Sequence, residues 1–116
     1  MMTYKRGDIV LALFPDSNLR TAKRRPVVVV QADHLATGLD QTIVAMISSN
    51  LKRANHPSRL IVQIATPQGQ QTGLHLDSVI MTDNLETILV SEIDCAIGLW
   101  PDATALDAAL RHTLAL

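Results

Sequence analysis

Lys23-Arg24-Arg25-Pro26-Val27-Val28-Val29-Val30-Gln31 is the stretch of this chain that decides the fold, because four consecutive valines follow a proline. β-Branched side chains favour extended backbone, and an uninterrupted apolar run is typical of a strand buried on both faces. We predict a strand over residues 26–31 with Pro26 in its first position, where a missing backbone N–H is tolerated. Three cations then lie directly before the strand, and Arg25 is held in place by the proline.

Outward from this stretch, further β-rich segments alternate with polar turns and make the chain mainly β. The apolar residues change to a spacing of three and four after Asp102, which predicts a C-terminal helix with Asp102 as its N-cap. Several short strands and one helix predict a small SH3-like barrel in a single domain, residues 1–116. The other predicted strands are residues 8–14, 42–48, 59–64, 77–81, 87–90 and 93–99, and residues 49–58 and 66–72 are predicted polar loops.

Composition excludes several classes of protein. The 116 residues are 47% hydrophobic, enough for a core, and their single cysteine, Cys95, excludes an intramolecular disulfide framework. Cys95 lies in an apolar stretch, so we expect a buried structural thiol. The sequence has no glycine-rich phosphate loop and no Cys/His spacing typical of metal sites, and we expect no metal and no cofactor. No membrane span or signal peptide is evident, so we expect a cytoplasmic protein.

Charge is divided unevenly along the chain. Residues 1–60 hold nine Lys and Arg against four Asp and Glu, a net +5, whereas residues 61–116 hold one Arg against seven acids, a net −6. The basic half can bind an anion, or the two halves can be solvated surfaces that pair across the fold. Arg25 is the sharpest candidate, since a guanidinium on a rigid base can hold a phosphate bidentately. Ser48-Ser49-Asn50 stands at the end of the strand of residues 42–48, where hydroxyls can contact phosphate or ribose or satisfy backbone groups.

In four segments the chain resembles the PemK/MazF family of toxin endoribonucleases from bacterial toxin–antitoxin pairs. The segments follow one another in the family's order and spacing, from residue 5 to about residue 100. They are Lys5-Arg6-Gly7-Asp8-Ile9-Val10, Arg25-Pro26-Val27-Val28-Val29-Val30-Gln31-Ala32-Asp33, Ile43-Val44-Ala45-Met46-Ile47-Ser48 and Asp77-Ser78-Val79-Ile80.

The resemblance implies a CcdB/PemK-like barrel that forms a homodimer, with a cognate antitoxin as partner. It implies metal-independent cleavage of single-stranded RNA, such as mRNA, at short sequences, by attack of the ribose 2′-OH on the adjacent phosphate. The products are a 2′,3′-cyclic phosphate and a 5′-OH. The family's catalytic arginine and hydroxyl residue fall on Arg25 and Ser48. The residues expected to bind RNA are Lys23, Arg24, Ser49, Lys52, Arg53 and Asn84.

Two departures from the family pattern leave an alternative open. Ser48 stands where threonine is commoner, and Glu86 stands where a basic residue is common. A non-catalytic toxin-like binding protein would fit these substitutions. So would a gyrase-targeting protein of the CcdB type, which uses the same barrel to bind a protein.

Overall fold

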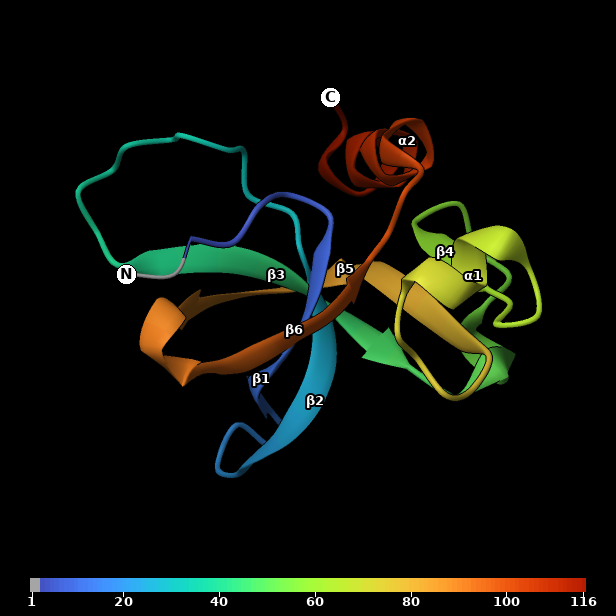
Figure 1. Ribbon diagram of the computed structural model, residues 1–116, viewed down its shortest axis with the longest axis horizontal. Helices are drawn as coiled ribbons and strands as arrows, with labels where there is room; N and C mark the ends of the chain where they lie inside the picture. The colour runs from blue at the N-terminus through green and yellow to red at the C-terminus, as the bar shows by residue number, and fades with distance from the viewer. Residues whose placement is uncertain (1–2) are drawn as a thin grey trace.

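A computed structural model describes residues 3–116 as one antiparallel sheet with a C-terminal helix (Figure 1). Its six strands are ordered β4-β5-β3-β2-β1-β6, and the sheet curls into a half-barrel. The prediction of a mainly β chain that ends in a helix is confirmed. The strands are β1 (Asp8–Pro15), β2 (Ala22–Val29), β3 (Gln41–Ser48), β4 (Arg59–Val62), β5 (Ser78–Leu89) and β6 (Ile93–Leu99), and the helices are α1 (Pro67–Gln71), α2 (Ala103–Leu114) and the short 3-10 turns η1 (Leu51–Arg53) and η2 (Val90–Glu92).

Both faces of the central strands are buried, as the valine run predicts. Val27 and Val28 are each fully buried, although successive side chains of a strand point to opposite faces. Val28 belongs to a cluster that Leu106 of α2 completes, and Val27 belongs to a second cluster around Phe14 on the other face. The sheet is therefore a rigid support for the side chains at the ends of β2 and β3.

The start of the valine strand differs from the prediction. β2 begins at Ala22, four residues before Pro26, because the hairpin pairing with β1 extends out to Pro15 and Ala22. Pro26 pairs with Leu11 of β1, but pairing with β3 begins only at Val27. A proline cannot donate to a ladder, so the β2–β3 ladder ends beside it. Arg25 therefore lies inside a strand instead of before one.

Two further elements correct the prediction. The two strands predicted over residues 77–81 and 87–90 are parts of the single strand β5, which leaves out only Asp77 and Val90 and whose pairing with β3 shifts register so that Ala45 faces Leu85 while Met46 faces Met81. The residues between them bulge out of the ladder. The predicted loop of residues 66–72 contains α1, which begins where the Thr66 hydroxyl accepts the Gly69 N–H at 3.0 Å.

The last third of the chain confirms one prediction, the N-cap of the C-terminal helix, and corrects another, the burial of Cys95. Asp102 caps α2 as predicted, since its carboxylate accepts the Ala105 N–H at 3.0 Å. Cys95 is exposed instead of buried, because it lies on the edge strand β6, three successive residues of which face solvent. In the part of the chain that the structure describes, no helix has the length and apolar character to cross a bilayer.

Candidate functional site

Arg25 and Ser48 lie opposite each other at the adjacent ends of β2 and β3. The register of these strands pairs Val27 with Met46, and two further residues along it bring Arg25 across from Ser48. No ladder hydrogen bond joins the strands there, because Pro26 ends the ladder. The two predicted catalytic residues therefore lie on neighbouring strands, just beyond the last β2–β3 pair.

Two cavities flank this pair, and both Arg25 and Ser48 line each of them. The first has a volume of about 360 Å³, and the second about 450 Å³. Other polar residues of the first cavity are Asp16, Ser17, Asn50, Arg53, Asn84 and Glu86. Those of the second cavity are Arg24, Ser49, His75 and Ser78.

The guanidinium of Arg25 is already bound to a carboxylate of its own chain. Arg25 Nη2 lies 2.7 Å from Oδ1 of Asp16, and the Thr21 hydroxyl donates to Oδ2 of Asp16 at 2.6 Å. The hydrogen bond from Thr21, then that from Arg25, holds the pKa of Asp16 below its usual range. Asp16 is therefore an anion near neutral pH and is the counter-charge of the Arg25 guanidinium.

The remaining donors of Arg25 are not all used. Its Nε is buried and has no hydrogen-bond partner among the described residues. A buried donor without a partner costs about 1–3 kcal/mol. Because the contact with Asp16 uses only Nη2, the guanidinium keeps donor capacity for an oxyanion.

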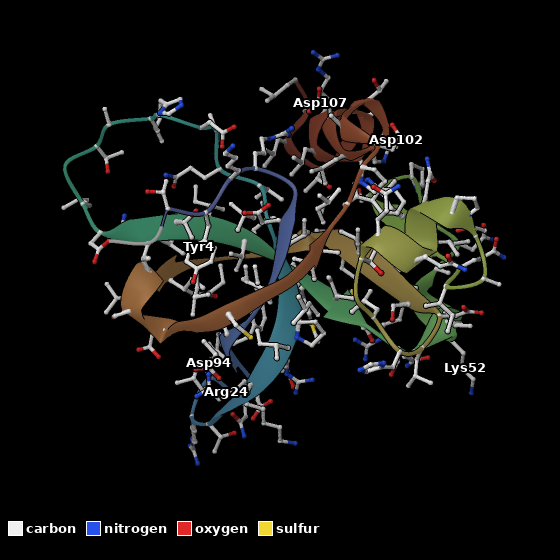
Figure 2. All side chains as sticks on the ribbon, viewed as in Figure 1. Tyr4, Arg24, Lys52, Asp94, Asp102 and Asp107 are labelled. Atoms are coloured by element: carbon white, nitrogen blue, oxygen red, sulfur yellow. The ribbon has the colours of Figure 1, made fainter. Side chains whose placement is uncertain are left out.

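The six residues predicted to bind RNA are placed in three ways. Arg53 and Asn84 line the first cavity, and Arg24 and Ser49 line the second. Lys23 and Lys52 line neither cavity. Figure 2 places Arg24 beside Asp94, to which it is ion-paired at 2.6 Å, and places Lys52 far from both, at another end of the molecule.

Asn84 reaches the cleft because of the bulge in β5. It lies between Met81 and Leu85, where the β3–β5 register shifts. Its amide nitrogen lies 3.0 Å from the Met46 sulfur, which fixes the side chain over β3. The bulge is anchored by Thr82, whose hydroxyl donates to the Ser58 carbonyl at 2.6 Å.

Charge in the first cavity is balanced. Arg25 and Arg53 contribute two positive charges, and Asp16 and Glu86 contribute two negative charges. Among its lining residues the second cavity has Arg24 and Arg25 but no carboxylate. The basic stretch around Arg25 therefore does not by itself make a positive cleft on the side of Asp16.

Sequence reasoning missed Asp16. The residues Pro15 to Asn18 have the composition of a turn, which predicts only the end of a strand, whereas the contact of Asp16 with Arg25 crosses the β1–β2 hairpin. A hairpin register of Pro15 with Ala22 would have been the signal, since it places the loop next to Arg25. Within residues 3–116, no three His, Cys, Asp or Glu side chains gather as metal ligands would.

A guanidinium, an alcohol and an amide that line one cleft can hold and polarise a phosphate group. The guanidinium neutralises charge on the nonbridging oxygens, the alcohol donates or accepts one proton, and the amide donates to a base or an oxygen. Such a set stabilises charge that develops on phosphorus oxygens during transesterification.

Comparison with known proteins gives one family and close relatives. Residues 5–114 match the model for PemK-like, MazF-like toxins of type II toxin–antitoxin systems. The chain is 33% identical over 119 residues to endoribonuclease MazF2 of Mycobacterium bovis, and equally to endoribonuclease MazF6 of Mycobacterium tuberculosis. Each match covers 99% of this chain and 100% of the relative.

Solved structures have the same fold. A mycobacterial endoribonuclease in complex with its cognate antitoxin superposes with a TM-score of 0.73 at 17% identity, over 98% of this chain and 97% of that one. The Mycobacterium tuberculosis toxin MazF-mt6 gives 0.71 at 24% identity, over 94% and 97%. A MazE–MazF structure from Deinococcus radiodurans gives 0.71 at 15% identity, over 99% of each chain.

Proposed function

The chain belongs to the PemK-like, MazF-like family of toxins of type II toxin–antitoxin systems and is a MazF-like endoribonuclease, and we propose that it cleaves single-stranded RNA at a phosphate bound by the side chains of Arg25 and Ser48. The observation that carries this proposal is that both residues line the same two cavities, beyond the point where the pairing of β2 with β3 ends. A phosphate of unpaired RNA that enters either cavity would therefore meet both side chains.

In the proposed reaction the 2′-oxygen of a ribose attacks its own 3′-phosphorus. The new O2′–P bond forms as the P–O5′ bond breaks and as the 2′-OH loses its proton. The products are a 2′,3′-cyclic phosphate and a 5′-OH, whose oxygen takes up one proton, so the step is balanced without any added reactant. Negative charge builds on the nonbridging oxygens, and Arg25 stabilises it. The nucleophile belongs to the substrate, so the chemistry requires no metal-activated water.

Ser48 orients the phosphate or relays a proton in this reaction, and Arg25 acts mainly through its charge. A guanidinium has no lone pair available to accept a proton while it stays charged, so it is a poor general base. Binding residues follow the cavities: Arg53 and Asn84 on the first side, Arg24 and Ser49 on the second. We expect Lys23 and Lys52 to contribute only long-range attraction, because neither lines a cavity.

A protein antitoxin is the second partner that we propose. The similar MazE–MazF and mycobacterial structures contain toxins in complex with their cognate antitoxins. An acidic antitoxin segment would place carboxylates where RNA places phosphates, since both anions take bidentate contacts from arginine. We also propose that the protein acts as a homodimer in the cytoplasm, where mRNA is available.

Purified protein and a single-stranded RNA in EDTA test the reaction. Wild-type protein is expected to produce fragments with cyclic phosphate and 5′-OH ends, and Arg25→Ala to cleave at least about 100-fold more slowly, as for loss of one charge-stabilising donor. Arg111→Ala, on α2 and outside both cavities, is the control. Equal cleavage by Arg25→Ala would refute the assigned role. Binding of an antitoxin or inhibition of gyrase without RNA cleavage would favour the non-catalytic alternative.

A further inference from the structure

We propose that Asp16 sets the affinity of the cleft for RNA: its carboxylate occupies the edge of the Arg25 guanidinium that a substrate phosphate takes, and RNA binds by replacing it. This inference rests on the proposed function, since it concerns the same arginine. It assigns a role in substrate binding to a residue of the β1–β2 loop that lies outside the four segments that carry the resemblance to the family.

The contact between the two side chains is of the kind that a phosphate would make. Oδ1 of Asp16 lies 2.7 Å from Nη2 of Arg25, the range of a charge-assisted hydrogen bond. The Arg25 side chain is 30% exposed and that of Asp16 is 15% exposed, so the pair is partly buried at the edge of the cavity. Carboxylate and phosphate oxygens accept hydrogen bonds from the same guanidinium donors, and one N–H of Nη2 cannot donate fully to both.

The turn keeps Asp16 in place against Arg25. Its second oxygen, Oδ2, accepts the Thr21 hydroxyl at 2.6 Å. Its backbone N–H donates to the Thr21 carbonyl at 2.8 Å, and its carbonyl accepts the Leu19 N–H at 2.9 Å. The carboxylate is therefore presented to Arg25 by a closed hairpin turn, and it is not a freely rotating surface group.

The charges in the first cavity predict whether the contact between Asp16 and Arg25 strengthens or weakens RNA binding. With Asp16 and Glu86 present, the first cavity has as many negative as positive groups. A phosphate that enters must displace one carboxylate and lie near another, which weakens binding. Removal of the Asp16 charge would leave Arg25 and Arg53 facing Glu86 alone, so RNA should bind more tightly.

Arg25 can accept the exchange without a backbone change. It lies in β2, and its Cα is held by pairing with Ala12 of β1. Its buried Nε has no partner while Nη2 is bound to Asp16. A phosphate that contacts two guanidinium nitrogens would take Nη2 from Asp16 and add a donor that Asp16 leaves idle. The bidentate contact is what allows a substrate to displace a carboxylate of the same chain.

Asp16→Asn and Glu86→Gln make a matched pair for the test. Each removes one negative charge from the same cavity and preserves side-chain shape, but only Asp16 contacts Arg25. We expect Asp16→Asn to lower KM for single-stranded RNA about tenfold with kcat within about twofold, the size of one charge-assisted contact. Glu86→Gln should lower KM less than about threefold.

Binding of an RNA oligonucleotide with 2′-deoxyribose at the cleavage site is the second measurement. It retains the phosphate but cannot react, so its Kd should also fall about tenfold for Asp16→Asn. A KM or Kd that rises in Asp16→Asn, or that matches Glu86→Gln, would overturn the inference. A fall in kcat of more than about tenfold, with a changed pH profile, would also overturn it, because Asp16 would then be a proton acceptor or a positioning residue.

The two proposals fail separately. If wild-type protein cleaves RNA but Asp16→Asn does not bind it more tightly, only the role of Asp16 is wrong. If wild-type protein does not cleave RNA, the proposed function is wrong, and the Kd of the oligonucleotide still decides whether Asp16 competes with a phosphate for Arg25.

Discussion

Side chains at the cleft derive their properties from neighbours that are distant in the sequence. Ser48 ends β3 beside Arg25, and its hydroxyl accepts the Asn50 N–H at 3.1 Å. That bond orients the oxygen toward its own loop, while its remaining lone pair and its proton are available to a ligand. A serine lacks the methyl group that restricts the χ1 angle of threonine, so this hydroxyl has more rotational freedom.

Replacement of Ser48 tests the hydroxyl alone. Ser48→Ala should lower kcat at least about tenfold, a modest proton-transfer or orienting contribution, because the alcohol that orients the phosphate is lost. Ser48→Thr should retain or raise kcat, since it keeps the oxygen and restricts its rotamers. Single-turnover cleavage of RNA measures both. If Ser48→Ala cleaves as fast as wild type, the hydroxyl only satisfies the Asn50 N–H.

Asp83 gives a prediction about stability and pH. Arg59 Nη2 lies 2.9 Å from Asp83 Oδ2, and hydrogen bonding to Arg59 lowers the pKa of Asp83 below its usual range. A lowered folded-state pKa stabilises the fold above the unfolded-state pKa of about 3.9, and this contribution is lost as pH falls through the folded-state value. Asp83→Asn should therefore lower the free energy of unfolding by about 0.5–1 kcal/mol at pH 7.

Urea unfolding between pH 7 and pH 3 measures this effect. The difference between wild type and Asp83→Asn should stay constant down to about pH 5 and close below about pH 4. Asp94→Asn is the control, because the Arg24–Asp94 pair is nearly half exposed. It should cost less than about 0.5 kcal/mol. A gap between wild type and Asp83→Asn that persists at the lowest pH would contradict the ion-pair explanation.

At the scale of the elements, the backbone of the turn after α1 packs closely against the backbone of β6 beside the second cavity. Gly73 has φ +73°, and a Cβ atom built on it would lie 2.0 Å from the Ile97 carbonyl oxygen of β6. No side chain fits at that distance without a shift of backbone. This close approach holds residues 73–78 over the sheet, where they form one wall of the cavity.

Substitution of two glycines separates the cost of a positive φ from the cost of a steric clash. Gly73→Ala should lower the free energy of unfolding by about 2–4 kcal/mol, because it adds a clash with Ile97 to the cost of a positive φ. Gly38 has a similar φ of +79°, but a Cβ atom built on it has nothing within 4 Å. Gly38→Ala should therefore lower the free energy of unfolding by only about 1 kcal/mol. Thermal or urea unfolding of both variants gives the difference. Equal losses would mean that the contact with β6 contributes nothing.

At the scale of the whole molecule, exposed apolar side chains favour a second copy as partner. Leu76, Leu99 and Ile61 are 64%, 42% and 53% exposed on a chain whose described sheet ends in the open edge strands β4 and β6. Exposed apolar residues of this kind are what a second copy of the chain would cover.

Sedimentation equilibrium at micromolar concentration tests the assembly. We expect a particle of twice the 12.6 kDa chain mass. A single species at the chain mass, with full cleavage activity, would contradict the homodimer and would place a complete site in one copy.

The amino-acid sequence by itself determined the buried valine strand, the capped C-terminal helix, the mainly β class and the family. These follow from local preferences and from residue order, which the chain carries wherever it lies. Only the tertiary structure decided that Arg25 lies inside β2 opposite Ser48, that β5 is one bulged strand, and that Cys95 is exposed. It also decided the contact of Asp16 with Arg25. Each of these depends on the register between strands distant in the sequence, which long-range pairing and packing set, and local residue preferences do not.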